Sequence, residues 1–158
     1  MREILFRGKM KDAGVWVYGS DVYQYGSDVY QYGCHEISLE HCEGEYEFDH
    51  YAIDPETVGQ YTGLIDKNGN KIFEGDVVKA VIVRDLGGGT QNREETGIIG
   101  YDKIGMIGLI AKYVGTIPVW SDFFQELVLS GCINDYWFEV IGNIHDNPEL
   151  IGGTEDGE

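Results

Sequence analysis

The chain has 158 residues, of which 42% are hydrophobic, and a formal net charge of −17 at pH 7. This composition supports a packed core and excludes global disorder, while the shortage of Lys and Arg opposes binding to nucleic acid or to anionic membranes. Its 23 Gly and only 3 Pro favour an all-β fold with many turns.

The first part of the chain predicts a β-hairpin followed by a repeat. Strands are expected at Glu3–Met10 and Val15–Tyr18, and Tyr18–Gln24 then recurs without change as Tyr25–Gln31. Two seven-residue copies are too few for a solenoid. They indicate either a tandem duplication in a tolerant loop or hairpin, or a tyrosine-rich binding surface. An acidic stretch follows, and a turn at Asp54–Thr57 marks the expected boundary after residue 57.

Residues 58–151 predict a meander of short strands. An Asn-Gly pair suggests a type I′ hairpin turn within Asp66–Asn70, where both central residues need positive φ. Further strands are expected at Val58–Leu64, Val77–Arg84, Gly97–Tyr101, Gly105–Val114 and Trp137–Ile144, with a loop at Asp85–Thr96, an irregular segment from Pro118 and a short helix at Asp122–Leu129. Curling such strands covers their edges. We therefore expect a mainly β protein: an SH3-like small β-barrel in 58–151, an N-terminal β-hairpin extension in 1–57, at most one short helix, and an acidic tail at 152–158.

Three segments resemble one known family. Gln60–Gly69, Ile72–Val78 and Glu139–Leu150 are similar to the YopX family of phage and prophage proteins from Gram-positive bacteria, and Arg2–Arg7 resembles the family's opening. The resemblance implies an SH3-like barrel, self-association, a phage or prophage origin and no known activity. It carries no catalytic residues over to this chain. The tandem repeat and the acidic stretch depart from the family's pattern.

Candidate metal ligands do not have the spacing of a metal motif. Cys34-His35 and His41-Cys42 supply the ligand types of zinc, but adjacent residues of a strand point to opposite faces, and Cys34 and Cys42 could instead form a disulfide. Asp66, Asn68 and Asn70 mimic the start of a calcium loop, which fails where its Gly and its bidentate Glu should follow. With three cysteines and no signal peptide, we expect a cytoplasmic protein of a bacterial host, without metal, cofactor or catalytic residues.

Aromatic residues are the remaining candidates for a site. We expect the binding residues to be Tyr23, Tyr25, Tyr30, Tyr32, Tyr61 and Phe73, although the last two are first of all core candidates. The leading hypothesis is a non-enzymatic phage or prophage accessory protein that acts through protein contacts or self-assembly, with a host or phage protein as a possible partner. The alternatives are an acidic nucleic-acid mimic that inhibits a host DNA-binding protein, and a weak nucleic-acid-binding barrel.

Overall fold

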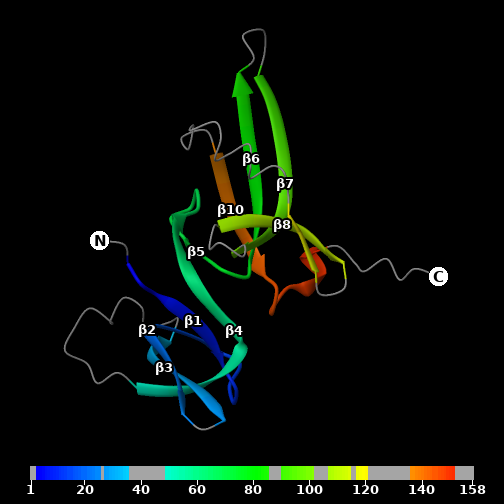
Figure 1. Ribbon diagram of the computed structural model, residues 1–158. Coiled ribbons are helices and arrows are strands. Elements are labelled where there is room, and N and C mark those ends of the chain that lie inside the picture. The colour runs from blue at the N-terminus through cyan, green and yellow to red at the C-terminus, as the bar shows by residue number, and fades with distance from the viewer. Residues whose placement is uncertain are drawn as a thin grey trace. The chain divides into compact units, whose positions relative to one another are not determined.

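The computed structural model describes residues 3–25, 27–35, 49–85, 90–101, 107–114, 117–120 and 136–151. The chain forms two compact units, Met1–Gly63 and Leu64–Glu158 (Figure 1). Nearly all of the described residues outside turns lie in β-strands, and the one described helical element is a 3-10 turn, η3 (Pro148–Ile151). The predicted mainly β fold class is confirmed.

The first unit contains a closed four-stranded barrel. Its strands are β1 (Phe6–Met10), β2 (Trp16–Tyr25), β3 (Asp28–His35) and β4 (Asp49–Ile65), paired antiparallel in that order. β4 also pairs with β1, and this pairing closes the ring. Val17 and Ile53 are fully buried. Most of the closed ring is thus built from residues that the sequence analysis had assigned to an N-terminal extension, and Gly59 and Gln60 of the predicted module 58–151 complete its pairing with β1.

A bulge in β4 stands where the sequence predicts a turn. Arg7 pairs with Gly59 and Lys9 with Asp54, so β4 inserts extra residues between these two positions. The Thr57 hydroxyl donates to the Asp54 carbonyl over 2.6 Å and accepts from the Lys9 backbone N–H at 2.8 Å. Local hydrogen bonds do turn the chain at Asp54–Thr57, but strand pairing continues on both sides, and the first unit extends to Gly63.

The second unit is built on one antiparallel sheet. β4 ends inside this unit and is followed by β5 (Lys71–Phe73), its neighbour in the strand order. The sheet has the order β10-β6-β7-β8-β9, so that the last strand pairs with the first long one. The strands are β6 (Asp76–Asp85), β7 (Thr90–Tyr101), β8 (Ile107–Val114), β9 (Ile117–Trp120) and β10 (Tyr136–Asn143). Figure 1 shows β6 and β7 running side by side as a long hairpin.

Apolar residues cover both faces of this sheet, because neighbouring residues of a strand point to opposite faces. One face buries Ile72, Val78, Ala80, Ile99 and Leu109, and the other buries Val77, Ile98 and Ile110. The second face is covered by Ile144 and by Leu150 and Ile151 of η3. The C-terminal segment is therefore part of the core of this unit.

The turn before β5 differs from the predicted type I′ turn. Gly69 has φ +88°, but no described residue other than glycine has positive φ, so Asn68 does not. The Gly69 N–H donates to the Asp66 carbonyl, and the Asp66 N–H donates to the Asn70 carbonyl. These bonds define a three-residue loop in which a type I turn is followed by a left-handed glycine. The Asp66 side chain stabilises this turn by accepting the backbone N–H groups of Asn68 and Asn70.

Two other predictions fail in the second unit. The predicted loop at Asp85–Thr96 is wrong from Thr90 onward, because those residues belong to a strand that pairs with β6. The pairing begins with Thr90 opposite Asp85. The segment predicted to be irregular after Pro118 includes strand β9, which pairs with β8. The predicted helix at Asp122–Leu129 and the acidic tail at 152–158 lie outside the described residues.

Candidate functional site

The tandem repeat folds into the hairpin formed by β2 and β3. Tyr23 of the first copy lies opposite Tyr30 of the second, and Tyr25 lies opposite Asp28 across the turn. A seven-residue shift along one straight strand would place equivalent residues on opposite faces, because side chains alternate with period two. Folding back at the turn removes this conflict, since residues directly opposite each other share a face. The hairpin interpretation of the repeat is confirmed.

The two copies of the repeat have different surroundings. Gln31 of the second copy is fully buried in the barrel, and its amide nitrogen donates to the Phe6 carbonyl at 2.9 Å. The equivalent Gln24 of the first copy is exposed. Asp28 forms an ion pair with Lys11 at 2.8 Å, and this hydrogen bond to Asp28 raises the pKa of Lys11. The second copy therefore contributes a buried side chain and an ion pair to the barrel, while Asp21 and Gln24 of the first copy are exposed to solvent.

The six predicted aromatic binding residues fall into three groups. Tyr25 is 78% exposed, and Tyr30 is half-buried. Tyr61 and Phe73 are buried in the first and the second unit respectively, so packing accounts for them. Tyr23 and Tyr32 hold known strand positions, but their side chains lie outside what the structure describes. The binding role remains a prediction, and Tyr25 is the residue of the set most available for it.

A cation–aromatic cluster on β1 and β2 was missed by the sequence analysis. The Arg7 guanidinium carbon lies 4.7 Å from the centre of the Trp16 ring, and the Lys9 ammonium lies 5.9 Å from it. Trp16 is opposite Lys9 in the hairpin, and Arg7 and Trp16 are both buried. Stacking on the ring partly compensates the loss of water around a cation. A sequence signal existed, since Arg7 and Lys9 share one strand face and face a tryptophan across a predicted turn.

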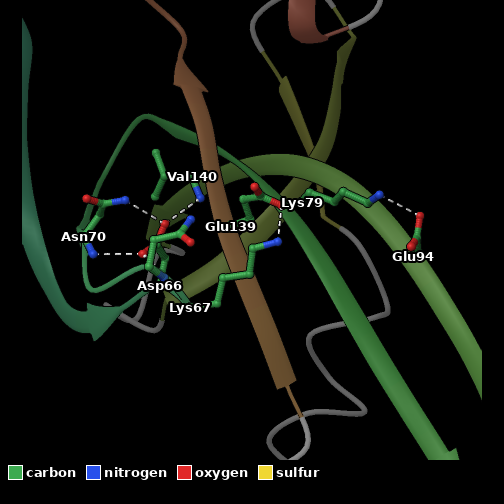
Figure 2. A network of polar contacts seen from close by, with 8 residues as sticks. Asp66, Lys67, Asn70, Lys79, Glu94, Glu139 and Val140 are labelled. Carbon is green, nitrogen blue, oxygen red and sulfur yellow. Dashed lines mark hydrogen bonds and ion pairs between the residues drawn. The ribbon is translucent and has the colours of Figure 1, made fainter.

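A second polar cluster centres on Asp66 in the other unit (Figure 2). One carboxylate oxygen accepts the backbone N–H groups of Asn68 and Asn70, both at 2.8 Å. The other accepts from the Asn70 side chain at 3.1 Å and from the Val140 N–H at 3.2 Å. Burial of Asp66 acts to raise its pKa, but these four hydrogen bonds outweigh burial and lower the pKa below its ordinary value of 3.8. Asp66 thus fastens the β4–β5 turn to β10.

Ion pairs extend along the same sheet, as Figure 2 shows. Lys67 contacts Glu139 of β10 at 2.6 Å, and its backbone N–H donates to the Phe138 carbonyl. Lys79 of β6 contacts Glu94 of β7 at 2.9 Å, and this hydrogen bond raises the pKa of Lys79. Such surface pairs contribute little stability. Their consequence is electrostatic, because each pair partly neutralises a lysine that would otherwise be available to bind a nucleic-acid phosphate.

The C-terminal segment Asn143–Asn147, which connects β10 to η3, is a hydrogen-bonded turn. The Asn143 side-chain oxygen accepts the N–H groups of His145 and Asp146 at 3.0 and 2.9 Å, and the Asn147 N–H donates to the Asn143 carbonyl. A Cβ at Gly142 would lie 2.5 Å from the Asn147 side-chain oxygen, so glycine permits the close packing of this turn. The turn delivers η3 to the sheet, which gives the motif a structural role.

The described residues include no group of three or more His, Cys, Asp or Glu side chains that could hold a metal ion. Cys34 and His35 end β3, where their side chains are not described, and His41 and Cys42 lie outside the described ranges. The zinc candidates therefore remain untested. In the calcium-like segment, the Asp66 oxygens accept hydrogen bonds within the turn, as the hairpin interpretation requires.

Comparison with known families supplies the identity of this architecture. The family model described as YopX protein matches residues 5–152, which covers both units. The chain belongs to the YopX family. The matched range spans the Asp66 turn and the C-terminal turn, and it confirms the family resemblance of the sequence segments. A search of curated proteins finds no match for this YopX-family chain. Among the described residues, no helix is long and apolar enough to cross a membrane.

Proposed function

We propose that this YopX-family protein is a non-enzymatic accessory protein of a phage or prophage. It works in the cytoplasm of a bacterial host through protein–protein contacts, including contacts between its own copies. The observation that carries the proposal is Tyr25, which is 78% exposed on a strand that the barrel holds in place. Tyrosine offers a large contact area at low entropic cost and is enriched in protein interfaces.

The hydrogen bonding of the polar side chains described above supports a non-enzymatic role. Asp66, Thr57 and Asn143 each hold a turn or bulge through short hydrogen bonds, so their polar atoms are engaged in the fold. A nucleophile or general base needs a polar atom that can reach a substrate. In contrast, the hairpin of the tandem repeat offers an exposed aromatic side chain and an extended backbone, which are the features of a protein-binding strand.

The test is to measure self-association and partner capture with the full-length protein. Light scattering after size exclusion reports the oligomeric state, and affinity capture from host lysate reports partners. Tyr25→Glu is expected to weaken at least one of these. Ile65→Glu is the matched control, because Ile65 is a similarly exposed apolar residue of the second unit, and the charge change is the same. A strictly monomeric protein that captures nothing would refute the proposal.

A second candidate function is an acidic mimic of nucleic acid that blocks a host DNA-binding protein. It is supported by the net charge of −17. The ion pairs of Lys11, Lys67 and Lys79 with carboxylates count against a nucleic-acid-binding barrel, which needs a basic stripe. Capture of a DNA-binding protein that weakens steeply with salt supports the mimic, whereas salt-insensitive capture refutes it.

A further inference from the structure

The strand segment Asp21–Tyr25 is complementary to itself. Its sequence is identical to that of Asp28–Tyr32, and the two segments pair antiparallel in a symmetric register. The five pairs are Asp21 with Tyr32, Val22 with Gln31, Tyr23 with Tyr30, Gln24 with Val29, and Tyr25 with Asp28. Read from either end, the ladder presents the same residue types in the same order. The chain therefore already contains the residue pairing that two such segments make when they align antiparallel in this register.

The first copy of the segment is placed to make this interface again. β1 accompanies β2 only as far as Gly19, which lies opposite Phe6, and Ser20–Tyr25 extend beyond the start of β1. The second copy lies between β2 and β4. Side chains of the first copy at Asp21, Gln24 and Tyr25 are exposed. The part of β2 that extends beyond the start of β1 thus carries exposed polar and aromatic side chains.

We propose that the segments Asp21–Tyr25 of two molecules pair antiparallel about a two-fold axis and join the proteins into a homodimer. The inference depends on the proposed function and deepens it by naming the strand segment through which two molecules associate. In the register seen within the chain, Tyr23 lies opposite Tyr23 of the other molecule, and Tyr25 lies opposite the other molecule's Asp21. A two-fold contact of this kind uses one surface patch on both molecules and closes at the dimer.

The geometry of antiparallel sheets is consistent with this arrangement. Backbone groups of alternate residues in a strand point to its two edges, so hydrogen-bonded and non-hydrogen-bonded pairs alternate along a ladder. If Tyr23 and Tyr30 form a hydrogen-bonded pair within the chain, then Tyr23 and Tyr23 of the other molecule form a non-hydrogen-bonded pair at the two-fold axis, and the reverse holds equally. The side-chain neighbours stay the same in both ladders, because the sequences and the register are the same.

Charge predicts how this dimer responds to salt. Each chain carries a net charge of −17, so two chains repel each other, and the charge of Asp21 contributes on both sides of the axis. Salt screens this repulsion. Dimerisation through the repeat is therefore expected to strengthen between low and moderate ionic strength, whereas a contact held by opposite charges would weaken.

The experiment is charge complementation at the two-fold axis, measured by sedimentation equilibrium of the full chain. Tyr23→Lys and Tyr23→Glu each place like charges opposite one another, and each is expected to weaken the homodimer about two- to fivefold. An equimolar mixture of the two variants places opposite charges together and is expected to form a heterodimer tighter than either homodimer. Tyr30→Lys is the matched control, because it occupies the same repeat position on β3 with the same charge change and should dimerise more tightly than Tyr23→Lys.

The outcomes separate this inference from the proposed function. A dimeric wild type whose Tyr23 variants associate like the wild type, alone and mixed, overturns the inference while self-association stands. A wild type that stays monomeric also overturns it, and partner capture then decides the proposed function by itself. If circular dichroism shows that the Tyr23 variants do not fold, Tyr25→Glu and Tyr25→Lys replace them. The exposed position tolerates both, and only Glu should weaken the pairing opposite Asp21.

Discussion

Replacement of Asp66 tests whether one carboxylate holds the β4–β5 turn against β10. Asp66→Ala deletes all four hydrogen bonds that the carboxylate accepts, three of them from backbone N–H groups. Asn68 and Asn70 are exposed, so water can replace the carboxylate at their N–H groups, whereas Val140 is half-buried and rehydrates less well. The loss therefore falls mainly on the link between the turn and the sheet.

The hydrogen bonds set the expected size of the effect. A hydrogen bond to a charged group contributes about 1.5–3 kcal/mol, and one that water replaces contributes less, so Asp66→Ala is expected to lower the free energy of unfolding by about 2–4 kcal/mol. Asn70→Ala removes one side-chain bond and keeps the backbone bonds. It serves as the control and should cost about 1 kcal/mol or less.

The pH dependence adds a signature that a mere packing defect does not produce. Because the pKa of Asp66 is lower in the folded than in the unfolded protein, its contribution is complete above the unfolded pKa and is lost as pH falls through the folded pKa. Urea denaturation at pH 7 and at several values below pH 3.8 should show that the difference in unfolding free energy between wild type and Asp66→Ala becomes smaller as pH falls. The reasoning is refuted if the cost is the same at all pH values, or if it does not exceed that of Asn70→Ala at pH 7.

Three further substitutions probe both units by thermal or urea denaturation. Gly97→Ala should cost roughly 3 kcal/mol or more, since its Cβ would lie 2.8 Å from the Ile110 carbonyl oxygen and 2.7 Å from Leu109; a change below 1 kcal/mol would contradict the packing. Gly69→Ala has open space but φ +88°, so only backbone strain of about 1–2 kcal/mol is expected, and a neutral effect would contradict the left-handed turn. Gln31→Glu buries a carboxylate in the barrel, and burial raises the pKa of this carboxylate, so the fold is destabilised as pH rises above the pKa of Glu in the unfolded chain. Protonation below about pH 4 restores a hydrogen-bond donor and should recover stability. A cost that does not change with pH would contradict the buried position of residue 31.

Local sequence signals located most of the strands. β-branched and alternating apolar residues predicted β6, β8 and β10 within a few residues of their observed ends. The signal failed at β7, whose first half is charged and reads as a loop. There, pairing with the strongly β-forming β6 overrides the local preference of Arg93–Thr96.

The candidate site was predicted only in outline. The repeat indicated a hairpin or a tyrosine surface, and the exposed Tyr25 keeps the second possibility open. The sequence could not separate Gln24 from Gln31, because the two copies are identical and only their neighbours differ. It also overlooked the stacking of Arg7 on Trp16, which depends on the register of β1 with β2.

By itself, the sequence determined the β class, the family and the positions of the tight turns, because turns and alternation depend on residues that are near neighbours in the chain. The tertiary structure decided that the closed barrel forms from β1 to β4 and that the C-terminal turn covers one face of the second sheet. It also decided which repeat copy is buried. These outcomes depend on pairing between residues far apart in sequence, and such pairing leaves no local pattern to read.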